Sequence, residues 1–205
     1  MDYLIITILG YLIGSIPNGL LIGRGLYDVD LRQFGSKNIG ATNAFRTLGL
    51  WPALWIFLTD GAKGVFAVAL AQYYLNTPIA LLLGGIGAIA GHNWSIFLKF
   101  TGGRGVATGL GVIAVLVPKV TALVFLVWAV VVYITRYVSL ASIIAATLVP
   151  ILMIVLGEQH EFLYFGITAA LFVVVRHKPN IERLLKGEES KITLGNMAKE
   201  TKSEK

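Results

Sequence analysis

The chain has 205 residues, of which 56% are hydrophobic and only 14% are charged, and its formal net charge at pH 7 is +6. A soluble domain is about 45–50% apolar and about 25% charged. The composition therefore excludes an ordinary soluble enzyme and a disordered chain. The absence of cysteine excludes disulfides, thiolate metal sites and iron–sulfur clusters. In so apolar a chain, the positive charge indicates the basic edges of a membrane protein and not a nucleic-acid partner.

Seven hydrophobic segments predict an all-α fold, a polytopic integral membrane helix bundle. They cover residues 2–23, 50–75, 78–98, 106–117, 120–135, 138–156 and 162–175. The first segment has neither a basic start nor a small-residue cleavage site, so it is interpreted as a retained helix and not as a signal peptide. Segment 106–117 is shorter than the roughly 20 residues of a straight span. It is either a thin span or a re-entrant hairpin.

The basic residues predict the orientation of this bundle. With seven crossings and the N-terminus outside, 15 of the 17 basic residues fall on the cytosolic side, the exceptions being Lys63 and Lys119. This distribution follows the positive-inside rule and places the C-terminus in the cytosol. A re-entrant fourth segment would invert the later loops and move Arg136 outside. Residues 1–188 are expected to form the membrane-embedded domain, and residues 189–205 a charged, disordered cytosolic tail.

Three polar clusters lie on the cytosolic side in this topology. The first spans residues 35–46, the second residues 91–109, and the third combines residues 136–142 with residues 176–183. In the second cluster, Arg104 stands among glycines that would let backbone N–H groups approach a phosphate, beside the predicted start of a helix. This pattern favours an anion site over simple close packing. It does not match the phosphate loop of nucleotide triphosphatases.

Other features have two interpretations. Ser36, Asn38, Thr42 and Asn43, next to Arg46, form either a polar binding loop or an ordinary capped turn. Glycines 84, 85 and 87 have no neighbouring charge, so close helix packing is favoured there. Asp60 and Lys63 share one helix face and are expected to neutralise each other inside the bundle. The histidines are scattered, so no metal site is predicted.

At these clusters the sequence resembles a known family, the bacterial membrane acyl-phosphate:glycerol-3-phosphate acyltransferases (the PlsY family). Its first motif resembles Gly35-Ser36, Asn38, Gly40 to Asn43 and Arg46. Its second motif resembles Gly91-His92 and residues 100–108. Its third resembles Arg176-His177, Asn180-Ile181, Arg183-Leu184 and Gly187-Glu188. Residues 136–142 also match the family. The match runs in order over residues 1–188. Arg104 stands where the family usually has lysine, and Ser95 where it often has proline.

The resemblance implies a reaction and a set of partners. A fatty acyl group passes from acyl-phosphate to the sn-1 hydroxyl of glycerol 3-phosphate, giving 1-acyl-sn-glycerol 3-phosphate (lysophosphatidic acid) and phosphate, as the first step of phospholipid biosynthesis. No cofactor is implied. The expected partners are these substrates, membrane lipid and the enzyme that produces acyl-phosphate, and the expected location is the bacterial plasma membrane with a cytosolic active site. A small transporter for a phosphorylated solute is the alternative, but the halves show no repeat and the polar groups gather at one face.

We assign hypothetical roles on this basis. The catalytic set is Ser36, Arg46, Arg104, Ser142, His177 and Asn180. The substrate- and phosphate-binding set is Asn38, Thr42, Asn43, Gly102, Gly103, Gly105, Arg136 and Ser139. In the first set the arginines and serines hold the phosphates, whereas His177 and Asn180 orient the glycerol phosphate or the attacked carbonyl. The backbone of the three glycines would cradle one phosphate, and Glu188 is expected to anchor the loop of the third motif.

Overall fold

The computed structural model describes residues 1–192, and the regular structure of this part of the chain is helical. The helices are α1 (Asp2–Ser15), α2 (Asn18–Tyr27), α3 (Ala41–Leu48), α4 (Leu50–Tyr74), α5 (Pro78–Asn93), α6 (Val106–Leu116), α7 (Pro118–Thr135), α8 (Val138–Leu156), α9 (His160–Arg176) and α10 (Lys178–Leu185). A short 3-10 helix, Ile96–Leu98, lies between α5 and α6. The all-α prediction is confirmed for the described residues. Residues 193–205, most of the predicted tail, lie outside them.

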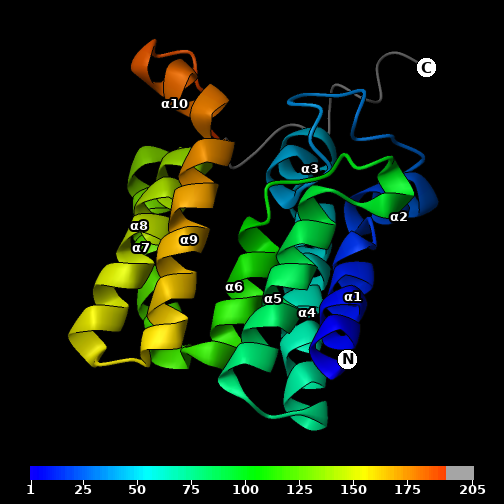
Figure 1. Ribbon diagram of the computed structural model, residues 1–205. Coiled ribbons are helices and arrows are strands. Elements are labelled where there is room, and N and C mark those ends of the chain that lie inside the picture. Colours follow the sequence, from blue (N-terminus) through cyan, green and yellow to red (C-terminus); the bar gives the residue numbers. More distant parts are fainter. Residues whose placement is uncertain (193–205) are drawn as a thin grey trace.

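The long helices stand in two groups, α1, α4, α5 and α6 in one and α7, α8 and α9 in the other (Figure 1). Helices α2, α3 and α10 lie at one end of the bundle, opposite the N-terminus (Figure 1). Four segments are long and apolar enough to cross a membrane, namely Asp2–Tyr27, Leu50–Tyr74, Pro118–Thr135 and Val138–Leu156. Helix α6 runs from the α3 end toward the opposite end, where α7 begins (Figure 1). The count of seven crossings stays a prediction.

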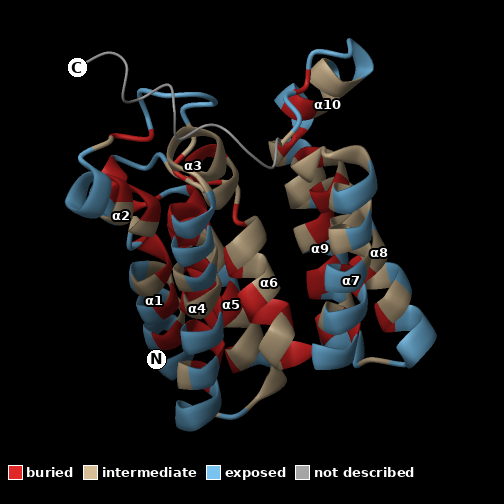
Figure 2. Cartoon of the chain, turned by 180° about the vertical axis from the view of Figure 1, so that it is seen from behind, coloured by how far each residue is buried: buried red, intermediate tan, exposed pale blue. Residues whose placement is uncertain are grey.

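The outward faces of the helices are apolar, as expected for lipid contact. Phe66 on α4, Leu126 on α7, Ile154 on α8 and Leu171 on α9 are each more than 60% exposed. The exposed faces point away from the gap between the two groups (Figure 2). Contiguous exposed apolar surface on this scale is unusual for a soluble monomer. It fits a bundle that is surrounded by acyl chains.

Small residues bring α1, α4, α5 and α6 close together. A Cβ atom on Gly84 of α5 would lie 2.8 Å from the carbonyl oxygen of Ala67 on α4, and a Cβ atom on Gly87 would lie 2.5 Å from that of Thr7 on α1. A larger side chain at either position would push the backbones apart. The geometry therefore supports the packing interpretation of these glycines.

The first hydrophobic segment is broken in the middle, which differs from the single helix predicted over residues 2–23. Helix α1 ends at Ser15, and α2 begins at Asn18. The cause is Pro17, which has no N–H and restricts the residue before it. The break frees backbone carbonyls inside the bundle. Lys63 Nζ binds those of Gly14 and Ile16, and Ser95 Oγ binds that of Ser15.

An apolar core joins the two groups of helices. Its buried members include Val112 on α6, Val120 on α7, Met153 on α8 and Phe165 on α9. These residues fill the space between the helices by close packing. Above this core, toward the end that holds α3 and α10, the interior becomes polar.

Candidate active site

A cavity of about 190 Å³ lies between the two groups of helices and receives side chains from all three predicted clusters. Residues distant in sequence meet here because α3, α6, α8 and α10 all begin at this end of the bundle (Figure 1). Of the predicted site residues, those that line the cavity are Ser36, Asn38, Thr42, Asn43, Arg46, Arg104, Gly105, Ser139, Ser142, His177 and Asn180. The remaining three, Gly102, Gly103 and Arg136, do not line it.

Four helix N-termini border the cavity. Residues at the starts of α3, α6, α8 and α10 line it. In chain order these are Gly40, Ala41, Gly105, Val106, Val138, Ser139, His177 and Asn180. The first N–H groups of a helix have no partner within the helix, and the helix dipole is positive at this end. At α10 this does not apply, because Pro179 has no N–H and the N–H of Asn180 already donates to the carbonyl of His177. The starts of α3, α6 and α8 make the cavity mouth suited to an anion.

The loop before α3 is organised by Asn43, which is only 1% exposed. Its Nδ2 donates to the carbonyl oxygens of Leu31, Phe34 and Asn38, and its Oδ1 accepts from the backbone N–H of Ser36. All of these partners belong to the loop, so the amide group of Asn43 holds the loop together. Asn43 also lines the cavity, so the substrate contact we predicted for it stays a prediction, and the hydrogen bonds add the role of positioning Ser36.

Two guanidinium groups provide positive charge at the cavity. Arg46 donates from Nη2 to the carbonyl oxygen of Ser190 at 2.7 Å, and its buried Nε has no partner among the described residues. Burial and the nearby Arg183 lower the pKa of Arg104, only partly offset by Glu189. Within residues 1–192, no side-chain hydrogen bond holds the Arg104 guanidinium. Its forked donors are therefore available to an oxyanion.

The glycine loop before α6 packs on α5 more than it opens to the cavity. The N–H of Gly103 donates to the carbonyl of His92 at 3.0 Å, so it is not free for a phosphate. A Cβ atom on Gly102 or Gly103 would clash with His92. The predicted phosphate cradle is corrected accordingly, since these two glycines serve close packing. Gly105 does line the cavity. Its φ of 76° favours glycine, and a Cβ atom there would lie 2.8 Å from Nδ2 of Asn93.

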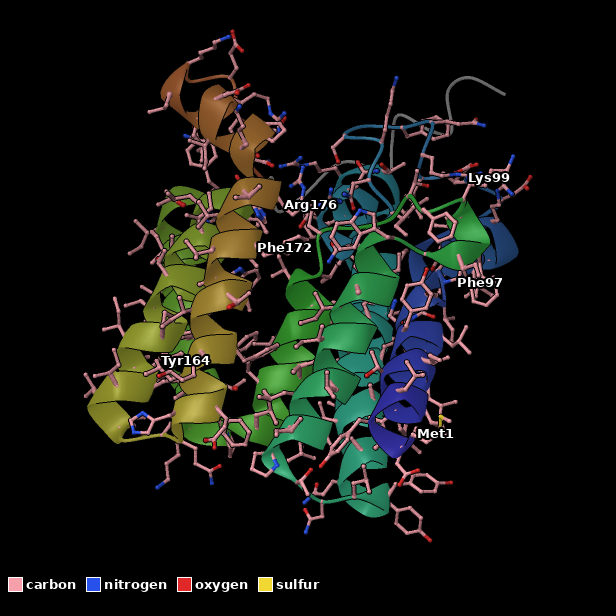
Figure 3. All side chains as sticks on the ribbon, viewed as in Figure 1. Met1, Phe97, Lys99, Tyr164, Phe172 and Arg176 are labelled. Carbon is pink, nitrogen blue, oxygen red and sulfur yellow. The ribbon has the colours of Figure 1, made fainter. Side chains whose placement is uncertain are left out.

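Arg176, at the end of α9 in the other group of helices, holds the same loop. Its Nη2 donates to the carbonyl oxygen of Gly103 at 2.8 Å, linking the end of α9 to the loop before α6. Figure 3 shows Arg176 and Phe172 on the side of α9 that faces α5, whereas Phe97 and Lys99 lie at the far edge of the bundle. The resemblance included Arg176 without a role. The structure indicates that it positions the loop carrying Arg104.

The third motif is anchored by Glu189 and not by Glu188. The Glu189 side chain is buried, and its carboxylate accepts hydrogen bonds from Ser139 at 2.9 Å, Asn180 at 2.8 Å and Arg183 at 2.7 Å. Burial raises the pKa of Glu189, but these three donors outweigh it and hold the pKa below its ordinary value. Glu188 is exposed. We expected Glu188 to anchor the loop. The structure assigns this role to Glu189, which we had placed in the tail.

His177 and Asn180 both present hydrogen-bond acceptors. The Nδ1 atom of His177 lies 2.8 Å from the carbonyl oxygen of Val173, which can only accept, so Nδ1 carries the proton. Burial lowers the pKa of His177, and Arg104 lowers it further. The ring is therefore neutral near pH 7, with Nε2 as its acceptor. Asn180 donates from Nδ2 to Glu189, which leaves its buried Oδ1 without a partner among the described residues.

Arg136 turns away from the cavity. Its guanidinium lies over the ring of Tyr133, 5.6 Å from the centroid, and its carbonyl accepts from the N–H of Ile192 at 2.9 Å. Its φ of 64° ends α7 in the left-handed conformation. We predicted Arg136 as a substrate-binding residue, and the structure gives it no contact with the cavity.

A buried polar network supports the wall of the cavity below these groups. Lys63 Nζ lies 2.9 Å from Asp60 Oδ1 and 3.1 Å from His92 Nδ1, and Asn18 donates to the same carboxylate at 3.2 Å. The expected neutralisation of Asp60 and Lys63 is confirmed. Asp60 and His92 also line the cavity, which our residue assignments did not foresee. In residues 1–192 no three acidic, histidine or cysteine side chains gather as a metal site.

The comparisons with known proteins decide the family. A model of the glycerol-3-phosphate acyltransferase family matches residues 4–187. The chain belongs to this family. It is 47% identical over 191 residues to the glycerol-3-phosphate acyltransferase of Prochlorococcus marinus (strain MIT 9301), which covers 92% of this chain and 97% of the relative. It is 46% identical over 190 residues to glycerol-3-phosphate acyltransferase 2 of Moorella thermoacetica, which covers 93% and 97%.

The fold of this acyltransferase is also found among solved structures. The glycerol 3-phosphate form of PlsY (YgiH), an integral membrane glycerol 3-phosphate acyltransferase, is similar with a TM-score of 0.88 and 37% identity, covering 94% of this chain and 96% of that one. The lysophosphatidic acid form of the same protein has a TM-score of 0.87. The resemblance inferred from the motifs is therefore confirmed. The chain is an integral membrane acyltransferase, which rules against the transporter alternative.

Proposed function

We propose that this acyltransferase moves a fatty acyl group from acyl-phosphate to the sn-1 hydroxyl of glycerol 3-phosphate, giving 1-acyl-sn-glycerol 3-phosphate and inorganic phosphate. The observation that carries the proposal is that the starts of α3, α6 and α8 and two arginines meet at one cavity above an apolar wall. Both substrates bear a phosphate, and one also bears an acyl tail. The cavity offers an environment for each of these groups.

The polar groups divide into donors and acceptors. Arg46, Arg104 and the first N–H groups of α3 and α6 donate, which suits phosphate oxygens. His177 Nε2 and Asn180 Oδ1 accept, which suits the hydroxyl groups of glycerol. Glycerol 3-phosphate would therefore lie with its phosphate toward the arginines and its hydroxyls toward His177 and Asn180. Glu189 makes this possible because it takes the Nδ2 donor of Asn180 and leaves the oxygen for the substrate.

The chemical step needs no covalent intermediate. The sn-1 hydroxyl oxygen attacks the acyl carbonyl, a new C–O bond forms, and the bond between that carbon and the phosphate oxygen breaks. The hydroxyl proton passes to a phosphate oxygen, directly or after transfer to His177. Acyl-phosphate is already activated, so positioning and stabilisation of the developing negative charge by the arginines supply the catalysis.

The membrane arrangement follows from the same proposal. Glycerol 3-phosphate is soluble in water, and the cavity mouth lies at the basic end of the bundle. We place this end on the cytosolic side of a bacterial plasma membrane, with the N-terminus outside and the C-terminus in the cytosol. The enzyme that produces acyl-phosphate would then deliver its product at this face or into the adjoining leaflet.

An assay on purified protein tests the proposal. Radiolabelled glycerol 3-phosphate is incubated with palmitoyl phosphate, palmitoyl-CoA or palmitoyl acyl carrier protein, and lysophosphatidic acid and phosphate are measured. We expect product with palmitoyl phosphate and stoichiometric release of phosphate. Robust turnover with a thioester in the complete absence of acyl-phosphate would contradict the proposed donor.

A further inference from the structure

Aromatic rings line the side of the cavity between α4 and α7. Phe57 on α4 and Phe125 and Trp128 on α7 line the cavity. The ring centroids of Phe57 and Phe125 are 6.5 Å apart, and Phe125 stacks on Trp128 with centroids 5.8 Å apart and planes inclined by 14°. The three rings therefore form a short row that crosses from one group of helices to the other.

This side is built differently from the opposite side. Between α5 and α9 the helices pack directly, Trp94 lies 5.4 Å from Phe172, and Arg176 is bonded to Gly103. Neither Trp94 nor Phe172 lines the cavity. Helices α4 and α7 are not packed directly together, and the contact between Phe57 and Phe125 spans the space between them. Viewed from behind, these two helices flank α6 (Figure 2).

Phe125 lies between the cavity and the outer surface. It lines the cavity, yet 43% of it is exposed, and its neighbour Leu126 is 61% exposed on the lipid-facing surface. Ring contacts of this kind are held by dispersion and quadrupole interactions without hydrogen bonds. Exposed side chains change rotamer on a picosecond to nanosecond timescale. Movement of one ring would therefore connect the cavity to the bilayer.

Trp128 connects this row of rings to the polar end of the cavity. Its Nε1 donates to the hydroxyl oxygen of Ser142 at 3.3 Å, and that hydroxyl donates to the carbonyl of Val138 at 2.9 Å. One side chain thus contacts both the aromatic row and a predicted catalytic residue. An apolar chain passing this row would end beside the phosphate-binding groups.

We propose that the acyl chain of the donor enters the cavity sideways from the bilayer, between α4 and α7, by parting the rings of Phe57, Phe125 and Trp128. This inference rests on the proposed function, because it takes acyl-phosphate as the donor. A long acyl chain is dissolved in the bilayer, and drawing it over the arginine-lined mouth would expose its apolar surface to water. The side route keeps the chain in apolar surroundings, while the phosphate moves along the polar end.

Reversible cross-linking tests the route, since the chain has no cysteine of its own. The double variant Phe57→Cys/Phe125→Cys is treated with a short bis-methanethiosulfonate reagent. Turnover is measured with palmitoyl phosphate and with water-soluble butyryl phosphate, before treatment, after it, and after reduction. The matched control is Trp94→Cys/Phe172→Cys, which joins the two groups of helices on the opposite side.

We expect cross-linking of the first pair to lower the ratio of palmitoyl to butyryl turnover at least tenfold, and reduction to restore it. The control pair should leave this ratio unchanged. An unchanged ratio in the first pair, an equal loss of both donors, or the same fall in the control would overturn the side route. If wild-type protein transfers neither acyl group, the proposed function fails, independently of any cross-link.

A second measurement decides the route if the cysteine variants fold poorly or are inactive. Wild-type protein is irradiated with a palmitoyl phosphate that carries a diazirine near the end of its chain, and the labelled peptides are sequenced. Labelling of α4 and α7 around Phe57 and Phe125, displaced by excess palmitoyl phosphate, supports the route. Displaceable labelling confined to α5 and α9, or none at all, would overturn it.

Discussion

The carboxylate of Glu189 accepts a hydrogen bond of 2.8 Å from the side-chain amide of Asn180. This contact sets the orientation of the amide, because a carboxylate can only accept and must face the nitrogen. The oxygen of Asn180 is then left buried without a partner among the described residues. A residue outside the recognised motif thus determines what a motif residue offers to the substrate.

Replacement of Glu189 should therefore reduce activity through Asn180. Glu189→Ala leaves Arg183 and Asn180 without their buried acceptor, at a cost of about 1–3 kcal/mol for each unsatisfied group. We expect kcat/KM for glycerol 3-phosphate to fall more than tenfold. The control is Glu188→Ala, which removes an exposed carboxylate one position earlier and should behave like the wild type. Equal losses in both variants would contradict the assignment of the anchor to Glu189.

The same carboxylate predicts a pH dependence. The pKa of Glu189 is lowered in the folded protein from its ordinary value of 4.5, so it stabilises the fold fully above that value. The contribution is lost as the pH falls through the lowered pKa. The difference in Tm between wild type and Glu189→Gln should be constant between pH 6 and 8 and shrink below pH 4.5. A difference that grows toward low pH would have the wrong sign.

Arg104 should bind phosphate. Arg104→Ala removes a charge-assisted hydrogen bond worth about 1.5–3 kcal/mol, so kcat/KM for glycerol 3-phosphate should fall roughly tenfold to a hundredfold. Arg104→Lys should retain part of the activity, since the charge survives and only the forked geometry is lost. Steady-state kinetics in detergent at matched expression levels make the comparison. A kcat/KM close to wild type in the alanine variant would place the phosphate elsewhere.

Arg176 should act on substrate affinity through the glycine loop. Arg176→Met removes the bond to the Gly103 carbonyl and frees the loop that carries Arg104. We expect KM for glycerol 3-phosphate to rise roughly tenfold, with a smaller change in kcat, and Arg176→Lys to recover part of the loss. Lys99→Gln is the matched control, because Lys99 is an exposed cation of the same loop outside the cavity. Identical KM values in Arg176→Met and the wild type would contradict this role.

Asp60 and Lys63 should stabilise the fold through their interaction with each other. Lys63→Met leaves the buried carboxylate of Asp60 without its cation and the carbonyls of Gly14 and Ile16 without their donor. The free energy of unfolding should therefore fall by about 3–5 kcal/mol. In Asp60→Asn/Lys63→Met the buried charge is gone, and we expect about half of the loss to be recovered. Thermal unfolding in detergent measures the cycle. Additive losses in the double variant would show that the two side chains are not coupled.

The topology can be tested by labelling single cysteines, because the chain contains none. Cysteine at the exposed position Lys37, at the end of the bundle that holds α3, should be inaccessible to an impermeant thiol reagent in intact cells and accessible after lysis. Cysteine at the exposed Gln159, at the opposite end, should react in intact cells. Reaction at Lys37 from outside would invert the proposed orientation.

The sequence by itself determined the fold class and the family. Apolar runs separated by polar loops indicate a helical membrane bundle because a lipid environment requires backbone groups to bond within each segment. Three motifs, around Ser36, Arg104 and His177, and the matching stretch around Ser142 identified the family, because several long matches in order are together specific. Eleven of the fourteen predicted site residues line one cavity.

Only the tertiary structure decided which of these residues face that cavity and which support it. Gly103 and Arg136 are residue types suited to a phosphate site. However, the N–H of Gly103 donates to the carbonyl of His92, and the guanidinium of Arg136 lies over the ring of Tyr133. Glu189, Arg176 and the aromatic row from Phe57 to Trp128 act across helices that are far apart in the chain. The residue type determines which hydrogen bonds a side chain can form, whereas the packing of helices distant in sequence determines which partner lies next to it.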